Sequence, residues 1–191
     1  MRVGIAHHLG WATCVAATDD HEVVDRRRID LLSGDLPNAP VHHEGGSHPL
    51  HRTGPAPTDE ALADLVAAVR ASARTTTGAE LDALADALPR PIASVSLRDW
   101  PADFPSDVAT QRRAPHESRA DSIMYLQVLA EAAVERGWTV HRYDHRQVED
   151  DAARLLGRRA EEVLHGPRAR LGPPWTKDHR MALAATIVCP R

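Results

Sequence analysis

The chain has 191 residues, of which 42% are hydrophobic and only 4% aromatic, so Val, Ile, Leu and Ala must supply most of its core. This length predicts a single domain over residues 1–191. A formal net charge of −4 and a pI near 6.3 exclude the overall basic character that drives nonspecific binding to nucleic acid, so any such surface has to be local.

The residue pattern contains neither the apolar segment of a signal peptide nor an apolar run long enough to span a membrane. We therefore expect a cytoplasmic protein without a membrane partner. Cys14 and Cys189 lie far apart and outside any Cys-x-x-Cys spacing, so we expect two buried thiols and no disulfide framework.

The first elements expected are β-strands at residues 3–5, 11–18 and 22–32, where β-branched and apolar residues are separated by turn-forming residues. The third run mixes apolar residues with the charged residues 25–28 and Asp30. This mixture predicts a strand with one solvated face or a strand at a sheet edge. The chain thus begins with a β-meander.

Residues 33–57 carry Gly, Pro and His without a hydrophobic period, so a long loop is expected there, with a short strand near residues 41–43. A helix begins at Thr58, whose hydroxyl can cap it ahead of two acidic residues. A second, separate helix is expected over residues 79–88, because Pro89 would end it.

A buried strand is expected at residues 92–97, followed by a second long loop over residues 100–115. The strongest helical pattern covers residues 118–136 and is ended by Gly137. Its apolar residues are numerous enough for a core face or for a homodimer contact. A further strand is expected at residues 138–143.

Helices are expected at residues 147–156, 159–164 and 178–188. The order of elements is therefore three strands, a loop, and then helix and strand in alternation, ending in helices. This order predicts an α/β fold with a mixed sheet, an N-terminal β-meander and flanking helices.

Three segments of this succession resemble the RNase H-like superfamily, and within it the RuvC-type resolvases, so the α/β fold expected is RNase H-like. The first resembles a hairpin whose opening strand ends in a catalytic Asp, the second the passage from the fifth strand into a helix, and the third an Ala-rich last helix that presents carboxylates to metal ions. The segments are Val3-Gly4-Ile5-Ala6 with Gly10-Trp11-Ala12, then residues 142–148, and Asp178-His179-Arg180-Met181-Ala182-Leu183-Ala184.

The resemblance implies nucleic acid as a partner and a divalent metal ion (Mg, Mn or Zn) as a cofactor, because nucleases of this superfamily hold metal ions with several carboxylates. The positions of those acids fall here on Ala6, near Arg98 with Asp99 adjacent, and on Met181, whereas Asp178 is retained. The metal site implied is therefore degenerate or rebuilt.

Histidines stand where the first acid is missing, at the end of the first strand. Because neighbouring strand residues point to opposite faces, at most one of His7 and His8 faces the cleft. Histidines that merely cap the strand with hydrogen bonds are the alternative interpretation. The candidate catalytic residues are Asp178, His7, His8 and Lys177, and the candidate metal ligands are Asp178, His179, His7 and Asp121, with Asp144 as a further source of a carboxylate.

Residues 42–51 concentrate four histidines and Glu44, which allows either a metal site or a solvated loop. Two other functions therefore stay open besides processing of nucleic acid: a metal-binding protein or metalloenzyme that uses clustered histidines, and an inactive interaction module. Whether the chain is an enzyme is left open by its residues.

Overall fold

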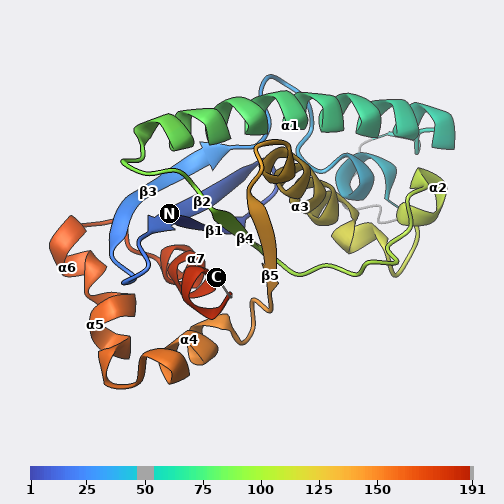
Figure 1. The fold of residues 1–191 in the computed structure, drawn as a ribbon. Helices are drawn as coiled ribbons and strands as arrows, with labels where there is room; N and C mark the ends of the chain where they lie inside the picture. The colour runs from blue at the N-terminus through green and yellow to red at the C-terminus, as the bar shows by residue number, and fades with distance from the viewer. Residues whose placement is uncertain (47–53, 190–191) are drawn as a thin grey trace.

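The structure is a computed structural model that describes residues 1–46 and 54–189. At its centre lies one five-stranded mixed sheet with the strand order β3-β2-β1-β4-β5 (Figure 1). The antiparallel meander β1-β2-β3 is joined to β4 and β5, which run parallel to β1. The predicted mixed sheet with an N-terminal meander is thus confirmed. The strands are β1 (Arg2–His7), β2 (Trp11–Ala17), β3 (Val23–Asp30), β4 (Ser94–Arg98) and β5 (Thr139–Tyr143).

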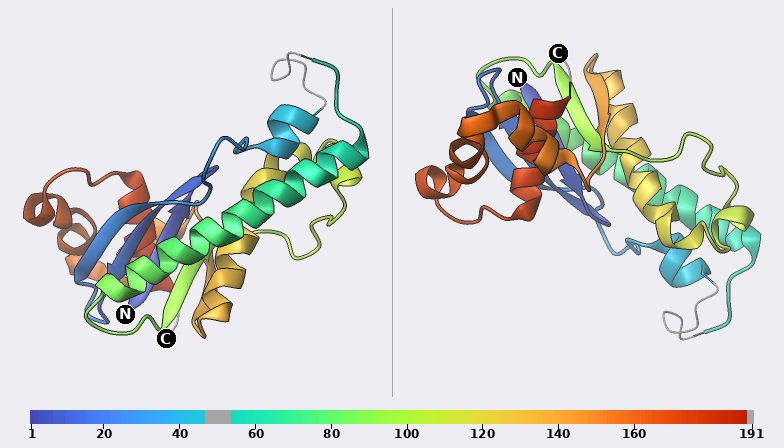
Figure 2. Two further views of the ribbon diagram at one scale, coloured as in Figure 1. Left: turned by 90° about the horizontal axis from the view of Figure 1, so that it is seen from above. Right: turned by 90° about the horizontal axis from the view of Figure 1, so that it is seen from below.

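Helices cover both faces of the sheet, α1 and α3 on one and α7 with α4, α5 and α6 on the other (Figures 1 and 2). Alternation along the strands supplies both cores: Ile5 and Cys14 face α1 and α3, whereas Ala6 and Val15 face α7. The helices are α1 (Asp59–Ala87), α2 (Val108–Gln111), α3 (Glu117–Glu135), α4 (Val148–Leu156), α5 (Ala160–His165), α6 (Pro167–Leu171) and α7 (Lys177–Val188), with the shorter η1 (Pro40–Gly45) and η3 (Gly157–Arg159).

The last helix lies directly on the first strand. A Cβ atom at Gly4 would be 1.8 Å from the carbonyl oxygen of Ala182, so only glycine allows this approach. The contact fixes α7 across β1 and brings the N-terminus of α7 to the edge of the sheet where β1 ends. Cys14 and Cys189 are both buried free thiols, one in each core.

One long helix, α1, runs without interruption through residues 75–78, so the prediction of a separate helix over residues 79–88 is wrong. Thr and Gly have low helix propensity, but tertiary contacts hold the helix together here. Thr77 is fully buried, and the guanidinium of Arg136, just after α3, donates to the carbonyl of Gly78 over 2.8 Å.

The segment η1 is helical, so the short strand predicted near residues 41–43 is also wrong. The backbone N–H groups of Val41 and His42 both donate to the Asp121 carboxylate, over 2.9 Å each. These bonds bend the segment around one side chain of α3 instead of leaving its N–H groups for a neighbouring strand. The remainder of the predicted histidine-rich loop, residues 47–51, lies outside the described residues.

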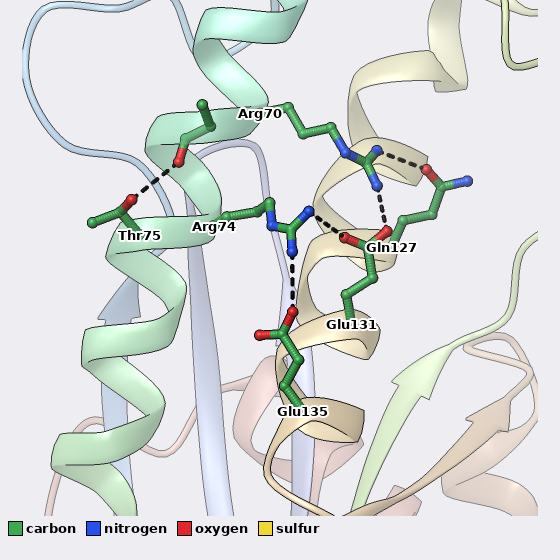
Figure 3. Close-up of polar contacts among 7 residues, drawn as sticks. Arg70, Arg74, Thr75, Gln127, Glu131 and Glu135 are labelled. Atoms are coloured by element: carbon green, nitrogen blue, oxygen red, sulfur yellow. Dashed lines mark hydrogen bonds and ion pairs between the residues drawn. The ribbon is translucent and has the colours of Figure 1, made fainter.

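Polar side chains join α1 to α3 along their outer side (Figure 3). Arg70 donates to Gln127 over 3.0 Å and pairs with Glu131, and Arg74 reaches Glu131 at 3.7 Å and Glu135 at 3.0 Å. Such partly exposed pairs contribute at most about 1 kcal/mol each. Within the described part of the chain, no helix has both the length and the apolar character needed to cross a membrane.

The apolar residues of α3 are used by the core. Leu126, Val128 and Leu129 are at most 2% exposed, whereas Val134 is 63% exposed. The surface that the sequence allowed for a homodimer is therefore mostly occupied by the sheet and α1, and the homodimer stays a prediction.

Candidate functional site

The candidate site lies at the edge of the sheet where β1, β4 and β5 end. These strands are parallel, so their carboxyl ends meet at one edge, and the loop between β5 and α4 and the beginning of α7 close in from the other layer. In open α/β sheets, side chains that follow such strand ends gather around one crevice.

The two histidines after Ala6 point to opposite layers, as strand alternation predicts. His7 Nε2 lies 2.8 Å from Ser122 Oγ of α3, whereas His8 Nε2 lies 3.0 Å from Asp178 Oδ2 of α7. Burial, aided by the nearby charges of Arg98 and His8, lowers the pKa of His7 to about 3. His7 is therefore a neutral imidazole near neutral pH.

His8 belongs to a layered group of rings at the sheet surface. Its imidazole stacks on the Trp11 indole with a centroid distance of 4.1 Å and an angle of 10° between planes. The Arg28 guanidinium lies 4.3 Å from the Trp11 ring, a cation–π distance. Together with the 3.0 Å pair to Asp178, this stack holds His8 in one orientation.

The side chain of His179 caps the beginning of its own helix, α7. Its Nδ1 accepts the backbone N–H of Thr176 over 3.2 Å and lies 2.8 Å from the Thr176 hydroxyl, forming a capping box. Burial lowers its pKa, and the charge of Arg26 adds to this effect. The Trp175 indole donates to the carbonyl of Leu164 over 2.8 Å, which anchors the beginning of α7.

Asp121 binds the backbone of η1 and does not contact the other predicted metal ligands. Both of its carboxylate oxygens accept backbone N–H groups, and burial raises its pKa in spite of those bonds. The exposed Lys177 lies close enough to His145 for its charge to lower the pKa of that residue, after burial and Arg98. Of the predicted site residues, only His8 and Asp178 are brought into direct contact.

The described residues do not fit a divalent metal ion. In residues 1–46 and 54–189, no three His, Cys, Asp or Glu side chains lie together as a metal site requires. The position that the resemblance gives to a metal-binding acid at the end of β4 falls near Arg98, with Asp99 adjacent, and Asp178 pairs with His8. The metal ligands proposed from sequence stay a prediction that this geometry does not support.

A polar groove of about 480 Å³ opens beside this edge, and sequence reasoning did not single out its basic residues. The phenol of Tyr143 is buried at its base and donates to the Ile5 carbonyl over 2.8 Å. Alternation along β4 offered a signal for Arg98, because it lies two residues after Ser96 on the face toward α7. The lining residues are Arg98, Asp99, Arg119, Tyr143, Asp144, His145 and Arg146.

No protein-family model matches the chain, and no curated protein has a significantly similar sequence. Among solved structures, Thermus thermophilus RuvC in complex with a Holliday junction substrate aligns with a TM-score of 0.51 and 14% identity, over 98% of this chain and 90% of RuvC. This chain has the RNase H-like fold. A second Thermus thermophilus RuvC structure aligns with a TM-score of 0.48 and 17% identity, over 98% of this chain and 91% of that one.

Proposed function

We propose that this chain is a nucleic-acid-binding protein, that residues 1–191 form one domain, and that nucleic acid lies along the edge where β1, β4 and β5 end. The observation that carries the proposal is the gathering of Arg98, Arg119, Arg146 and Lys177 at this edge on a chain whose formal net charge is −4. A local basic patch is the expected electrostatic footprint of a polyanion. The likeness to RuvC bound to a Holliday junction favours nucleic acid over other polyanions.

The chain binds nucleic acid but does not hydrolyse its phosphodiester bonds with metal ions. Two-metal cleavage needs carboxylates that bridge or flank the ions, and the acids at this edge are engaged elsewhere. Asp178 pairs with His8 at 3.0 Å, Asp144 accepts the backbone N–H of Arg146 over 2.8 Å, and Asp99 lies 3.8 Å from Arg142. The chain therefore keeps the fold of a nuclease around a site rebuilt for contact with phosphates.

The test compares binding by the intact chain with binding by two double variants, using fluorescence anisotropy at low salt. The substrates are a labelled four-way junction, a duplex, a single strand and an RNA–DNA hybrid. Replacing Arg119 and Arg146 with Gln removes two exposed charges at the groove, and affinity for the bound substrate should fall about tenfold or more. The matched control, Arg158→Gln with Arg168→Gln, removes two exposed charges from η3 and α6 and should change affinity about twofold at most.

Absence of binding to all four substrates by the unaltered chain would overturn the proposed function. Equal losses in both double variants would show that general charge, not this edge, is responsible. The same samples, incubated with magnesium, manganese or zinc, should show no strand cleavage, and metal-dependent cleavage would contradict the rebuilt site.

A further inference from the structure

The arginine at the end of β4 differs from the other buried arginines of the chain. No hydrogen bond or ion pair of the Arg98 side chain occurs among residues 1–46 and 54–189. The side chain of every other arginine in the described chain that is at least partly buried makes a hydrogen bond or an ion pair. These arginines are Arg2, Arg26, Arg27, Arg70, Arg112, Arg136 and Arg180.

An unpartnered guanidinium in such a place is electrostatically unsatisfied. Burial lowers the pKa of Arg98, and the positive charges of Arg119 and Arg146 lower it further, although Tyr143 and Asp144 act in the opposite direction. A partly desolvated charge is unfavourable unless a counter-ion and hydrogen bonds compensate it. An anion bound at the end of β4 would therefore compensate the charge of Arg98.

The position of Arg98 indicates which kind of anion binds there. It ends a strand parallel to β1 and lines the groove together with Arg119 and Arg146, which come from α3 and from the loop before α4. These three guanidinium groups, which we call the phosphate cradle, line the groove together with the carboxylates of Asp99 and Asp144. Guanidinium presents paired N–H donors that match two oxygens of a phosphate.

Resting on the nucleic-acid binding proposed above, we propose that Arg98, flanked by Arg119 and Arg146, binds one backbone phosphate in the place where the nucleases of this fold hold a divalent metal ion. The guanidinium supplies the positive charge that the metal would supply. It holds the phosphodiester without activating water, since it carries no exchangeable water ligand and stays protonated at neutral pH. Binding is therefore independent of divalent ions.

The first experiment titrates inorganic phosphate and measures heat release and melting temperature at constant ionic strength, with chloride as the reference. The intact chain should bind phosphate in the presence of EDTA, and the Arg98→Gln variant should lose about tenfold or more in affinity. Arg98→Lys keeps the charge but not the paired donors and should fall between the two. Arg90→Gln is the matched control, because Arg90 is an exposed arginine before β4, at the opposite end of that strand.

The second experiment repeats the anisotropy measurement on nucleic acid with either EDTA or magnesium, at equal ionic strength. Equal affinity in both, with a loss of about tenfold or more in Arg98→Gln, is the result expected. Should Arg98→Gln bind nucleic acid and phosphate as tightly as the intact chain, the phosphate cradle is wrong while the proposed function stands. Binding that needs magnesium also overturns it. If the intact chain binds phosphate at Arg98 but no nucleic acid, the proposed function fails and the anion site alone is retained.

Removing Arg98 should not unfold the protein, because the change deletes an unpartnered charge. The melting temperature of Arg98→Gln is expected to equal or exceed that of the intact chain without phosphate. Should that variant nevertheless misfold, Arg146→Gln gives the same test at an exposed position of the groove.

Discussion

His7 is the residue whose protonation the fold opposes strongly. Its pKa is about 3 in the folded chain and about 6.5 in the unfolded chain. Between these values the unfolded state binds a proton that the folded state does not, so stability is complete above about pH 6.5 and falls as the pH is lowered. From pH 6.5 to pH 5 the loss due to His7 is about 2 kcal/mol.

Urea unfolding at about pH 7.5 and pH 5 measures this effect. In His7→Gln, the decrease in the free energy of unfolding between the two pH values should be smaller than in the intact chain by about 2 kcal/mol. His165→Gln, at an exposed position on α5, should leave the decrease unchanged. A decrease in His7→Gln equal to that of the intact chain would show that His7 titrates normally.

Asp121 acts through two backbone N–H groups, and its replacement tests that role. Asn offers one oxygen where η1 presents two donors, so Asp121→Asn should lose about 1–3 kcal/mol of stability. Hydrogen exchange at the Val41 and His42 amides should accelerate more than exchange in the strands. Asp86→Asn, at an exposed acid on α1, should affect neither; a stable Asp121→Asn protein with protected amides would refute this role.

At the scale of elements, α1 continues through a glycine that the fold does not need. Gly78 has no positive φ, and an added Cβ would lie 3.5 Å from the Arg136 side chain, an ordinary contact. Gly78→Ala should stabilise the protein by about 0.5–1 kcal/mol, or raise its melting temperature by about 1–4 °C, because alanine loses less backbone entropy in a helix. The same change at Gly4 should be severely destabilising, because its Cβ would be 1.8 Å from the Ala182 oxygen.

A lower melting temperature in Gly78→Ala, measured by circular dichroism, would mean that α1 is interrupted at residues 75–78, as the sequence alone predicts. Local propensity gave that wrong boundary, because the Arg136 bond to Gly78 comes from a residue more than fifty positions away. The strands were predictable for the opposite reason: their apolar runs and turns are local patterns. The partners of the η1 backbone, supplied by Asp121, were hidden from such patterns as well.

The candidate site shows the same division. Strand alternation separates His7 from His8, and the beginning of α7 brings Asp178 to His8. What sequence reasoning missed is the role of Arg98. The sequence shows that an acid is absent there, but the lack of any partner for the arginine is a property of three-dimensional packing.

At the scale of the whole molecule, a chain with a formal net charge of −4 repels a polyanion at long range, so attraction has to arise at the groove and at short range. Neutralising one phosphate on B-DNA contributes about −0.9 to the slope of log K against log salt concentration. With one phosphate held by Arg98, and with Arg119 and Arg146 each reaching the next phosphate along the backbone, duplex binding should follow a slope of about −3. Binding should therefore be measurable only at low salt.

Titrating the salt concentration on a labelled duplex checks this prediction with single variants. Arg119→Gln and Arg146→Gln should each make the slope less steep by about 0.9, because each removes one contact with the backbone. Arg90→Gln, at the opposite end of β4, should lower the affinity slightly through net charge but leave the slope as it is. A slope that changes equally in all three variants would show that the duplex does not bind specifically at the groove. A slope near zero would show that the groove does not bind phosphates.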